Sequence, residues 1–189
     1  MKKLLILASV TSIASASQAA FFDWENLPAF VSASSYSQTD GGITATASAP
    51  GAMVEAHTQS VTGFGSRALL GVTPNYSAVR IDFDTALASI SVQAGDNGFD
   101  ADPDIQMEAY TAGDLLVGSD IGSIAENVLD PITLTVTGAD IAFVILSSGG
   151  DFPNTVYWDN MTANPVPEPA TMALLGLGAV AVLRRRIRR

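Results

Sequence analysis

The sequence predicts an all-β domain, an antiparallel β-sandwich of the jelly-roll kind, over residues 20–163. Short runs of alternating apolar and polar residues recur there, as in Val79-Arg80-Ile81-Asp82-Phe83-Asp84. Turn-forming clusters such as Asp40-Gly41-Gly42 and Ser148-Gly149-Gly150-Asp151 separate these runs at intervals typical of sandwiches. No part of this stretch carries a sustained helical stripe of apolar residues, and about 144 residues suffice for one such core.

The runs of β-prone residues bounded by turn residues are predicted as strands. In chain order they are 30–37, 43–48, 53–58, 78–84, 88–94, 105–110, 132–137, 141–146 and 155–161. Alternation is clear in 78–84, 88–94 and 132–137, so each of these strands buries one face. The run 141–146 is apolar throughout, and we therefore expect it in the centre of its sheet.

Charge divides the chain into three segments. Residues 20–163 hold 18 acidic residues against two basic ones, Arg67 and Arg80, which gives a net charge of −16. A surface this acidic repels phosphate backbones, so no nucleic-acid partner is expected. The chain has no Cys and one His, which excludes disulfides, thiolate metal sites and a His-rich metal site.

Residues 1–19 have the order of a signal peptide. Lys2 and Lys3 supply the positive region, residues 4–13 are mostly apolar, and residues 15–19 are mostly small. We predict cleavage by signal peptidase after Ala19. The mature chain would then leave the cytoplasm, and without a disulfide it would depend on its core and on bound ions for stability.

Residues 164–189 form a tail in three parts. Three prolines within 165–169 favour an extended spacer, and residues 170–183 carry no charge. As a helix these 14 residues would rise about 21 Å, short of a roughly 30 Å hydrocarbon core. Snorkelling arginines at the far end would complete a transmembrane helix over 170–183 and keep the C-terminus in the cytoplasm. These arginines are Arg184, Arg185, Arg186, Arg188 and Arg189.

The motif Val166, Pro167, Glu168, Pro169, followed by a short apolar helix and an Arg cluster, resembles the PEP-CTERM sorting tail of Gram-negative bacteria. The resemblance implies export across the inner membrane and a transient membrane anchor. It also implies that an exosortase recognises the motif, cleaves near it, and releases the protein or transfers it to the cell surface. The host would make exopolysaccharide. The alternative is a permanent C-terminal membrane anchor.

Three segments, 22–28, 95–110 and 157–161, resemble the domain that commonly precedes such tails, and that domain is similar to jelly-roll carbohydrate-binding modules and lectin-like sandwiches. This resemblance implies one structural Ca²⁺ held by Glu25 and Asp159, with no other cofactor. The alternative is that both are ordinary surface acids. The alternating Asp residues of 96–104 present oxygens suited to a hard cation, or form a solvated turn without one.

Several aromatic residues are candidates for stacking on sugar rings, or for packing in the core. They are Trp24, Phe99, Tyr110, Phe152, Tyr157 and Trp158. Trp24 and Trp158 are the candidate sugar contacts beside the calcium ligands.

No nucleophile motif accompanies these residues, so the chain is predicted not to be an enzyme. The leading hypothesis is an exported surface or biofilm-matrix protein whose sandwich is structural or binds exopolysaccharide. The alternative is a secreted polysaccharide hydrolase that uses paired carboxylates. Too few Thr-x-Thr arrays are present to favour an ice-binding surface.

Overall fold

The computed structural model describes residues 18–72, 76–96, 100–150 and 152–167, and these ranges contain strands and no helix. The strands are β1 (Ala20–Phe22), β2 (Ser32–Ala33), β3 (Ser35–Asp40), β4 (Ile43–Ser48), β5 (Met53–His57), β6 (Ala68–Val72), β7 (Val79–Gly95), β8 (Asp102–Tyr110), β9 (Leu116–Ile124), β10 (Ile132–Ser147) and β11 (Tyr157–Pro165). All pairings between these strands are antiparallel. The prediction of an all-β antiparallel domain is confirmed.

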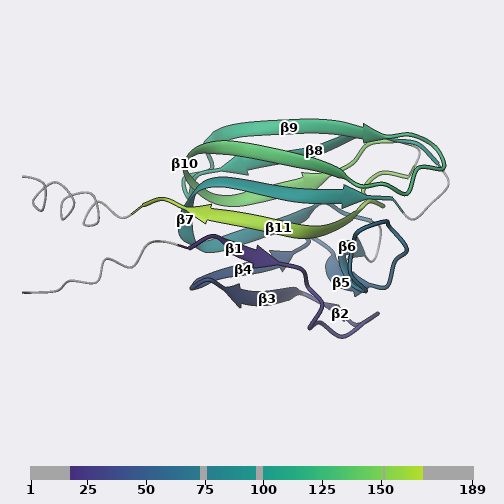
Figure 1. The fold of residues 1–189 in the computed structure, drawn as a ribbon, viewed down its shortest axis with the longest axis horizontal. Coiled ribbons are helices and arrows are strands. Elements are labelled where there is room, and N and C mark those ends of the chain that lie inside the picture. The colour runs from purple at the N-terminus through teal and green to yellow at the C-terminus, as the bar shows by residue number, and fades with distance from the viewer. Residues whose placement is uncertain (1–17, 73–75, 97–99, 151, 168–189) are drawn as a thin grey trace, which may run out of the picture. The chain divides into compact units, whose positions relative to one another are not determined.

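The long strands β7 and β10 organise the sheet, because β7 changes partners along its length. Its first half pairs with β4 on one side and with the end of β10 on the other. Its second half pairs with β11 and with the beginning of β10. Figure 1 shows β7, β10 and β11 running beside one another in the middle of the fold.

Two halves of the sheet follow from this change of partners. One half runs β3, β4, β7, β10, β8, β9, and the other runs β10, β7, β11, with β1 and β6 both paired to β11. Ile81 of the first half, Ile90 of the second and Met107 of β8 are all fully buried in one hydrophobic cluster. Two halves around a single core are consistent with a β-sandwich, while the jelly-roll arrangement stays a prediction.

The sequence predicted two strands where the structure forms the single strand β7. Buried positions are Val79, Ile81, Phe83 and Leu87 in its first part and Ile90, Val92 and Ala94 in its second. The alternation of buried and exposed side chains therefore shifts by one residue between Leu87 and Ile90. Because of this shift, the sequence pattern predicted two strands in place of one. The predicted runs 132–137 and 141–146 join in the same way as β10, whose register with β7 shifts between Thr137 and Ile141. As expected, 141–146 lies centrally, between β7 and β8.

The predicted turn at Asp40-Gly41-Gly42 connects β3 to β4 and requires its glycines. Gly41 and Gly42 have φ of 56° and 81°, in the left-handed region that a side chain disfavours. β3 and β4 pair in full register from Asp40↔Ile43 outward. The tight turn therefore sets the register of the whole hairpin.

The first and last strands lie side by side and bring both ends of the described domain to one place. β1 pairs with β11 from Ala20↔Ala163 to Phe22↔Met161. β11 runs to Pro165, after which the backbone N–H of Val166 donates to the carbonyl of Ala86 over 3.0 Å. The start of the predicted sorting motif is thus hydrogen-bonded to the sheet. The predicted signal peptide (with the exception of its last two residues), the apolar helix and the arginine cluster lie outside the described residues.

Candidate functional site

The predicted calcium pair, Glu25 and Asp159, lies where the turn after β1 meets β11. A register shift in β11 between Asp159 and Thr162 includes Asn160, whose φ is 47°. Trp158 pairs with Ala94 and Asp159 pairs with Gln93, so the two side chains lie on opposite faces of β11, and both are buried. Asp159 is fully buried, and its Oδ2 accepts a hydrogen bond from the N–H of Gly65 at 3.4 Å.

Burial raises the pKa of Asp159 to about 7, and the nearby charges of Glu25 and Asp23 act in the same direction. Oδ1 of Asp159 is buried with no hydrogen-bond partner among the described residues. Glu25 is tied to the segment before β6, because its Oε1 accepts from the N–H of Arg67 at 2.8 Å and its Oε2 from the hydroxyl of Ser66 at 2.6 Å. The structure therefore places the two predicted carboxyl groups close enough for the charge of Glu25 to act on the pKa of Asp159.

These two carboxylates alone do not supply enough ligands for a calcium ion. Ca²⁺ takes six to eight oxygen ligands, and the unpartnered Oδ1 of Asp159 is a suitable first ligand. Within the described ranges no group of three or more His, Cys, Asp or Glu residues is arranged to hold a metal ion. Backbone carbonyls and water would have to supply most of the coordination.

The two tryptophans next to this pair are core residues. Trp24 is 1% exposed and Trp158 is 2% exposed. Trp24 also packs against Phe22, with ring centroids 6.0 Å apart. Because neighbours cover both rings, neither offers a face to a sugar, and the burial favours the packing alternative over sugar contact.

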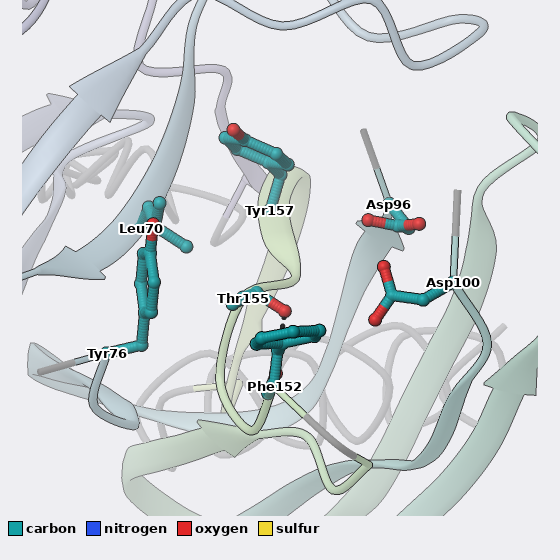
Figure 2. Close-up of a pocket in the computed structure, with 7 residues that line it drawn as sticks. All are labelled: Leu70, Tyr76, Asp96, Asp100, Phe152, Thr155 and Tyr157. Carbon is teal, nitrogen blue, oxygen red and sulfur yellow. Dashed lines mark hydrogen bonds between the residues drawn. The ribbon is translucent and has the colours of Figure 1, made fainter. Parts of the chain in front are cut away.

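A pocket of about 440 Å³ lies elsewhere on the domain. Figure 2 shows the side chains of its lining, which come from β6, β11 and the loops beside β7, β8 and β11. They are Leu70, Tyr76, Asp96, Asp100, Phe152, Thr155 and Tyr157. Tyr76 is 52% exposed and Phe152 is 62% exposed, so two aromatic rings are open to solvent at its rim. The pocket thus combines exposed rings with carboxyl and hydroxyl groups.

The acidic side of the pocket is formed by Asp96 and Asp100, whose carboxyl groups point toward one another in Figure 2. Asp102, two residues further on, is 1% exposed, and its Oδ2 is buried with no hydrogen-bond partner in the described part of the chain. Burial first, and then the charges of Asp96 and Asp100, raise the pKa of Asp102 to about 7. The electric potential around this loop is therefore negative.

A row of rings leads away from the pocket at Tyr157. The ring of His57 lies 5.9 Å from that of Tyr157, and the ring of Phe30 lies 4.8 Å from that of His57. Phe30 is 58% exposed. Aromatic surface therefore continues beyond the pocket onto β5 and the loop before β2.

Among the described residues, His57 is not arranged with a serine for nucleophilic catalysis. Its Nε2 lies 2.8 Å from Oε1 of Glu55, and the hydroxyl of Ser32 donates to Oε2 of the same Glu55 at 2.7 Å. The serine is therefore hydrogen-bonded to the acid and not to the imidazole, which is the reverse of what a Ser-His pair needs. The Glu55 carboxylate serves to join β2 to β5.

Of the sorting-motif residues, Val166 and Pro167 are described, whereas Glu168 and Pro169 lie outside the described residues. No helix in the described ranges has the length and apolarity that a membrane span requires.

Residues 165–189 match the PEP-CTERM protein-sorting motif. The chain matches no curated protein. The motif indicates a protein that is exported and sorted by an exosortase to the cell surface or the extracellular space.

The sequence alone pointed to some of the pocket residues and missed others. Phe152 and Tyr157 were among the candidate aromatics, and Asp96 and Asp100 belong to the acidic run 96–104. No sequence pattern marked Tyr76 or Thr155 as candidate binding residues. They meet the others only because β11 pairs with both β6 and β7, which brings three distant loops together.

Proposed function

We propose that this exosortase-sorted protein is a non-catalytic component of the cell surface or extracellular matrix whose β-sandwich binds exopolysaccharide. The observation that carries the proposal is the pocket that holds Tyr76 and Phe152 beside Asp96, Asp100 and Thr155. The apolar C–H face of a sugar ring packs on an aromatic ring, while carboxylate and hydroxyl oxygens accept hydrogen bonds from sugar hydroxyls. Sorting to the surface delivers such a pocket to the place where exopolysaccharide accumulates.

The second candidate is a polysaccharide hydrolase, favoured by the facing carboxyl groups of Asp96 and Asp100. Glycoside hydrolysis needs one carboxyl that stays protonated near neutral pH and a second that is ionised. The strongly raised pKa in this loop belongs to Asp102, which does not line the pocket. We therefore place catalysis second. Reducing-sugar release that disappears in Asp96→Asn or Asp100→Asn would establish it.

Equilibrium binding to a panel of polysaccharides tests the leading proposal. The purified protein is expected to bind at least one of them saturably, with no release of reducing ends. Phe152→Ala removes an exposed ring and is expected to weaken binding about fivefold, since losing one stacked ring costs on the order of 1 kcal/mol. Tyr110→Ala is the matched control, because Tyr110 stacks on Phe143 and does not line the pocket. Absence of binding to every polysaccharide would refute the proposal.

We also propose that Asp159 and Glu25 hold one structural Ca²⁺ beside β11. Support comes from the buried, unpartnered Oδ1 of Asp159 and from the proximity of a second carboxylate. Calorimetric titration with Ca²⁺ is expected to show a single site that Asp159→Asn removes and that the exposed control Glu126→Gln retains. A titration without heat, together with a Tm that chelator leaves unchanged, would eliminate the ion.

A further inference from the structure

We propose that the folded sandwich controls access to the sorting motif, because the end of β11 holds Val166 in the sheet and the exosortase acts only after this end detaches. The inference rests on the sorting motif and does not depend on glycan binding. The residues that match the motif begin at Pro165, and β11 also ends at Pro165. The folded domain and the motif therefore overlap, with no spacer between them.

The end of β11 is held by hydrogen bonds to β7. The side-chain amide of Asn164 donates from Nδ2 to the hydroxyl of Ser89 over 3.0 Å. The backbone N–H of Val166 donates to the carbonyl of Ala86, also over 3.0 Å. Val166 belongs to the same compact unit as the rest of the sandwich. The first residue of the Val-Pro-Glu-Pro motif is thus part of the folded domain.

This end of the strand is bound on one side only. The pairing of β11 with β1 ends at Ala163, and beyond that residue β7 is its one partner among the described strands. Pro167 is exposed and has no N–H, so the hydrogen bonds of the strand cannot continue past Val166. A strand end held by a few hydrogen bonds opens at a much lower free-energy cost than the whole domain. Residues 164–166 can therefore detach while the core stays folded.

Cleavage of a folded substrate depends on such local opening. When opening and closing are faster than cleavage, the rate of cleavage follows the population of the open form. Asn164 and Ser89 are then positioning residues, because their hydrogen bond sets that population without changing the motif. Ser89 precedes Asn164 by 75 positions in the sequence. An enzyme that reads only the sorting motif would not respond to a change at Ser89.

The first test is Ser89→Ala in the full chain, expressed in a host that carries an exosortase. Pulse-chase labelling measures how fast the precursor is converted to the processed form. The variant loses the acceptor of Asn164 and is expected to be processed about two- to tenfold faster, the range that one net hydrogen bond spans. Ser89→Thr retains a hydroxyl and is expected to keep the wild-type rate.

Ser37→Ala is the matched control, because it also removes a serine hydroxyl that makes one hydrogen bond between strands. That bond joins Ser37 to Thr46, and it lies between β3 and β4, away from the pairing of β7 with β11. The control is expected to be processed at the wild-type rate.

Hydrogen exchange gives a readout that needs no exosortase. The unprocessed full chain is purified from a host without the enzyme, and exchange of the Val166 amide is followed. Ser89→Ala is expected to speed this exchange by the same factor as processing. The amide of Val144, which lies between β7 and β8, is expected to exchange at the wild-type rate. This comparison separates local opening of the strand end from loss of global stability.

A Gly-Ser-Gly-Ser insertion between Pro165 and Val166 removes the overlap, because four extended residues move the motif about 13 Å beyond the strand. This variant is expected to be processed faster than the wild type and to be insensitive to Ser89→Ala. The same insertion after Gly113, in the turn between β8 and β9, is the control and should leave the rate unchanged.

Two results would overturn the proposal. One is a Ser89→Ala variant whose Val166 amide exchanges faster while its processing rate stays that of the wild type. The other is an insertion before Val166 that does not accelerate processing. In either case the exosortase would reach its cleavage site without opening the end of β11.

Discussion

Asp102 shows at the scale of one residue how burial creates a pH-sensitive group. It is the first residue of β8, is 1% exposed, and has an unpartnered carboxyl oxygen in the described part of the chain. Burial, with the charges of Asp96 and Asp100, raises its pKa from 3.8 to about 7 in the folded protein. The unfolded chain loses this proton near its ordinary pKa, so between about pH 4 and pH 7 the folded state binds more protons. Stability contributed by Asp102 is therefore full below pH 4 and is lost as pH rises to 7.

Asp102→Asn keeps the shape of the side chain and removes this titration. The variant is expected to be more stable than the wild type at pH 8, by about 1 kcal/mol or more, and the difference should vanish near pH 4. Urea denaturation of both proteins at a series of pH values measures it. Parallel curves for the two proteins would mean that Asp102 keeps an ordinary pKa in the fold.

The residues of the candidate sites differ in how far the sequence could identify them. Glu25 and Asp159 were predicted as calcium ligands, and that role stays a prediction, while the charge of Glu25 contributes to the raised pKa of Asp159. The burial of Trp24 and Trp158 agrees with core packing, the alternative that the sequence left open beside sugar contact. Tyr76 was missed because an isolated aromatic in a turn has no periodic pattern to mark which side it faces.

At the scale of elements, the alternation of apolar and polar residues predicted where several strands lie but not how long they are. β4 matches its predicted bounds, because Ile43, Ala45 and Ala47 alternate cleanly with polar neighbours. β6, all five of whose residues are buried, was missed by the sequence analysis. β9 was missed because Gly118, Gly122 and two serines dilute its β-prone residues. A Cβ atom at Gly122 would lie 2.6 Å from Cδ1 of Ile132, so a larger residue at this position would require the Ile132 side chain to move.

β7 is the element on which both halves of the sheet depend. Ile90 is fully buried in its second half and stands between Val136 of β10 and Ala163 of β11. Ile90→Ala leaves a cavity and is expected to cost about 2–5 kcal/mol of unfolding free energy. Ser91→Ala, at the next position on the opposite side of the strand, is the control and should change stability by less than about 0.5 kcal/mol. Chemical denaturation compares them, and similar losses in both would show that Ile90 is not a core position.

Acidic and basic residues are unevenly distributed along the chain, and this distribution affects the stability of the folded domain. Residues 20–163 carry 18 acidic residues against two basic ones, while the arginines that end the chain belong to the sorting motif at 165–189. In the described ranges the one ion pair between a basic side chain and a carboxylate, apart from that of His57, is Arg80 with Asp82. Most of the negative charge of the sandwich therefore has no positive counterpart in the fold, and its mutual repulsion opposes compactness.

Salt should consequently stabilise this protein. Raising NaCl from about 0.01 M to 0.15 M shortens the Debye length from about 30 Å to about 8 Å, which screens repulsion between acids on different strands. We expect the Tm to rise, and about 1 kcal/mol of relief corresponds to about 2–4 °C for a chain of this size. Chloride is preferred to sulfate because sulfate also strengthens apolar burial.

CaCl₂ at the same ionic strength separates screening from calcium binding. An additional rise in Tm that Asp159→Asn abolishes belongs to the calcium site. A Tm that falls or stays constant with NaCl would show that the acids are spaced too widely to repel, and the argument from net charge would fail.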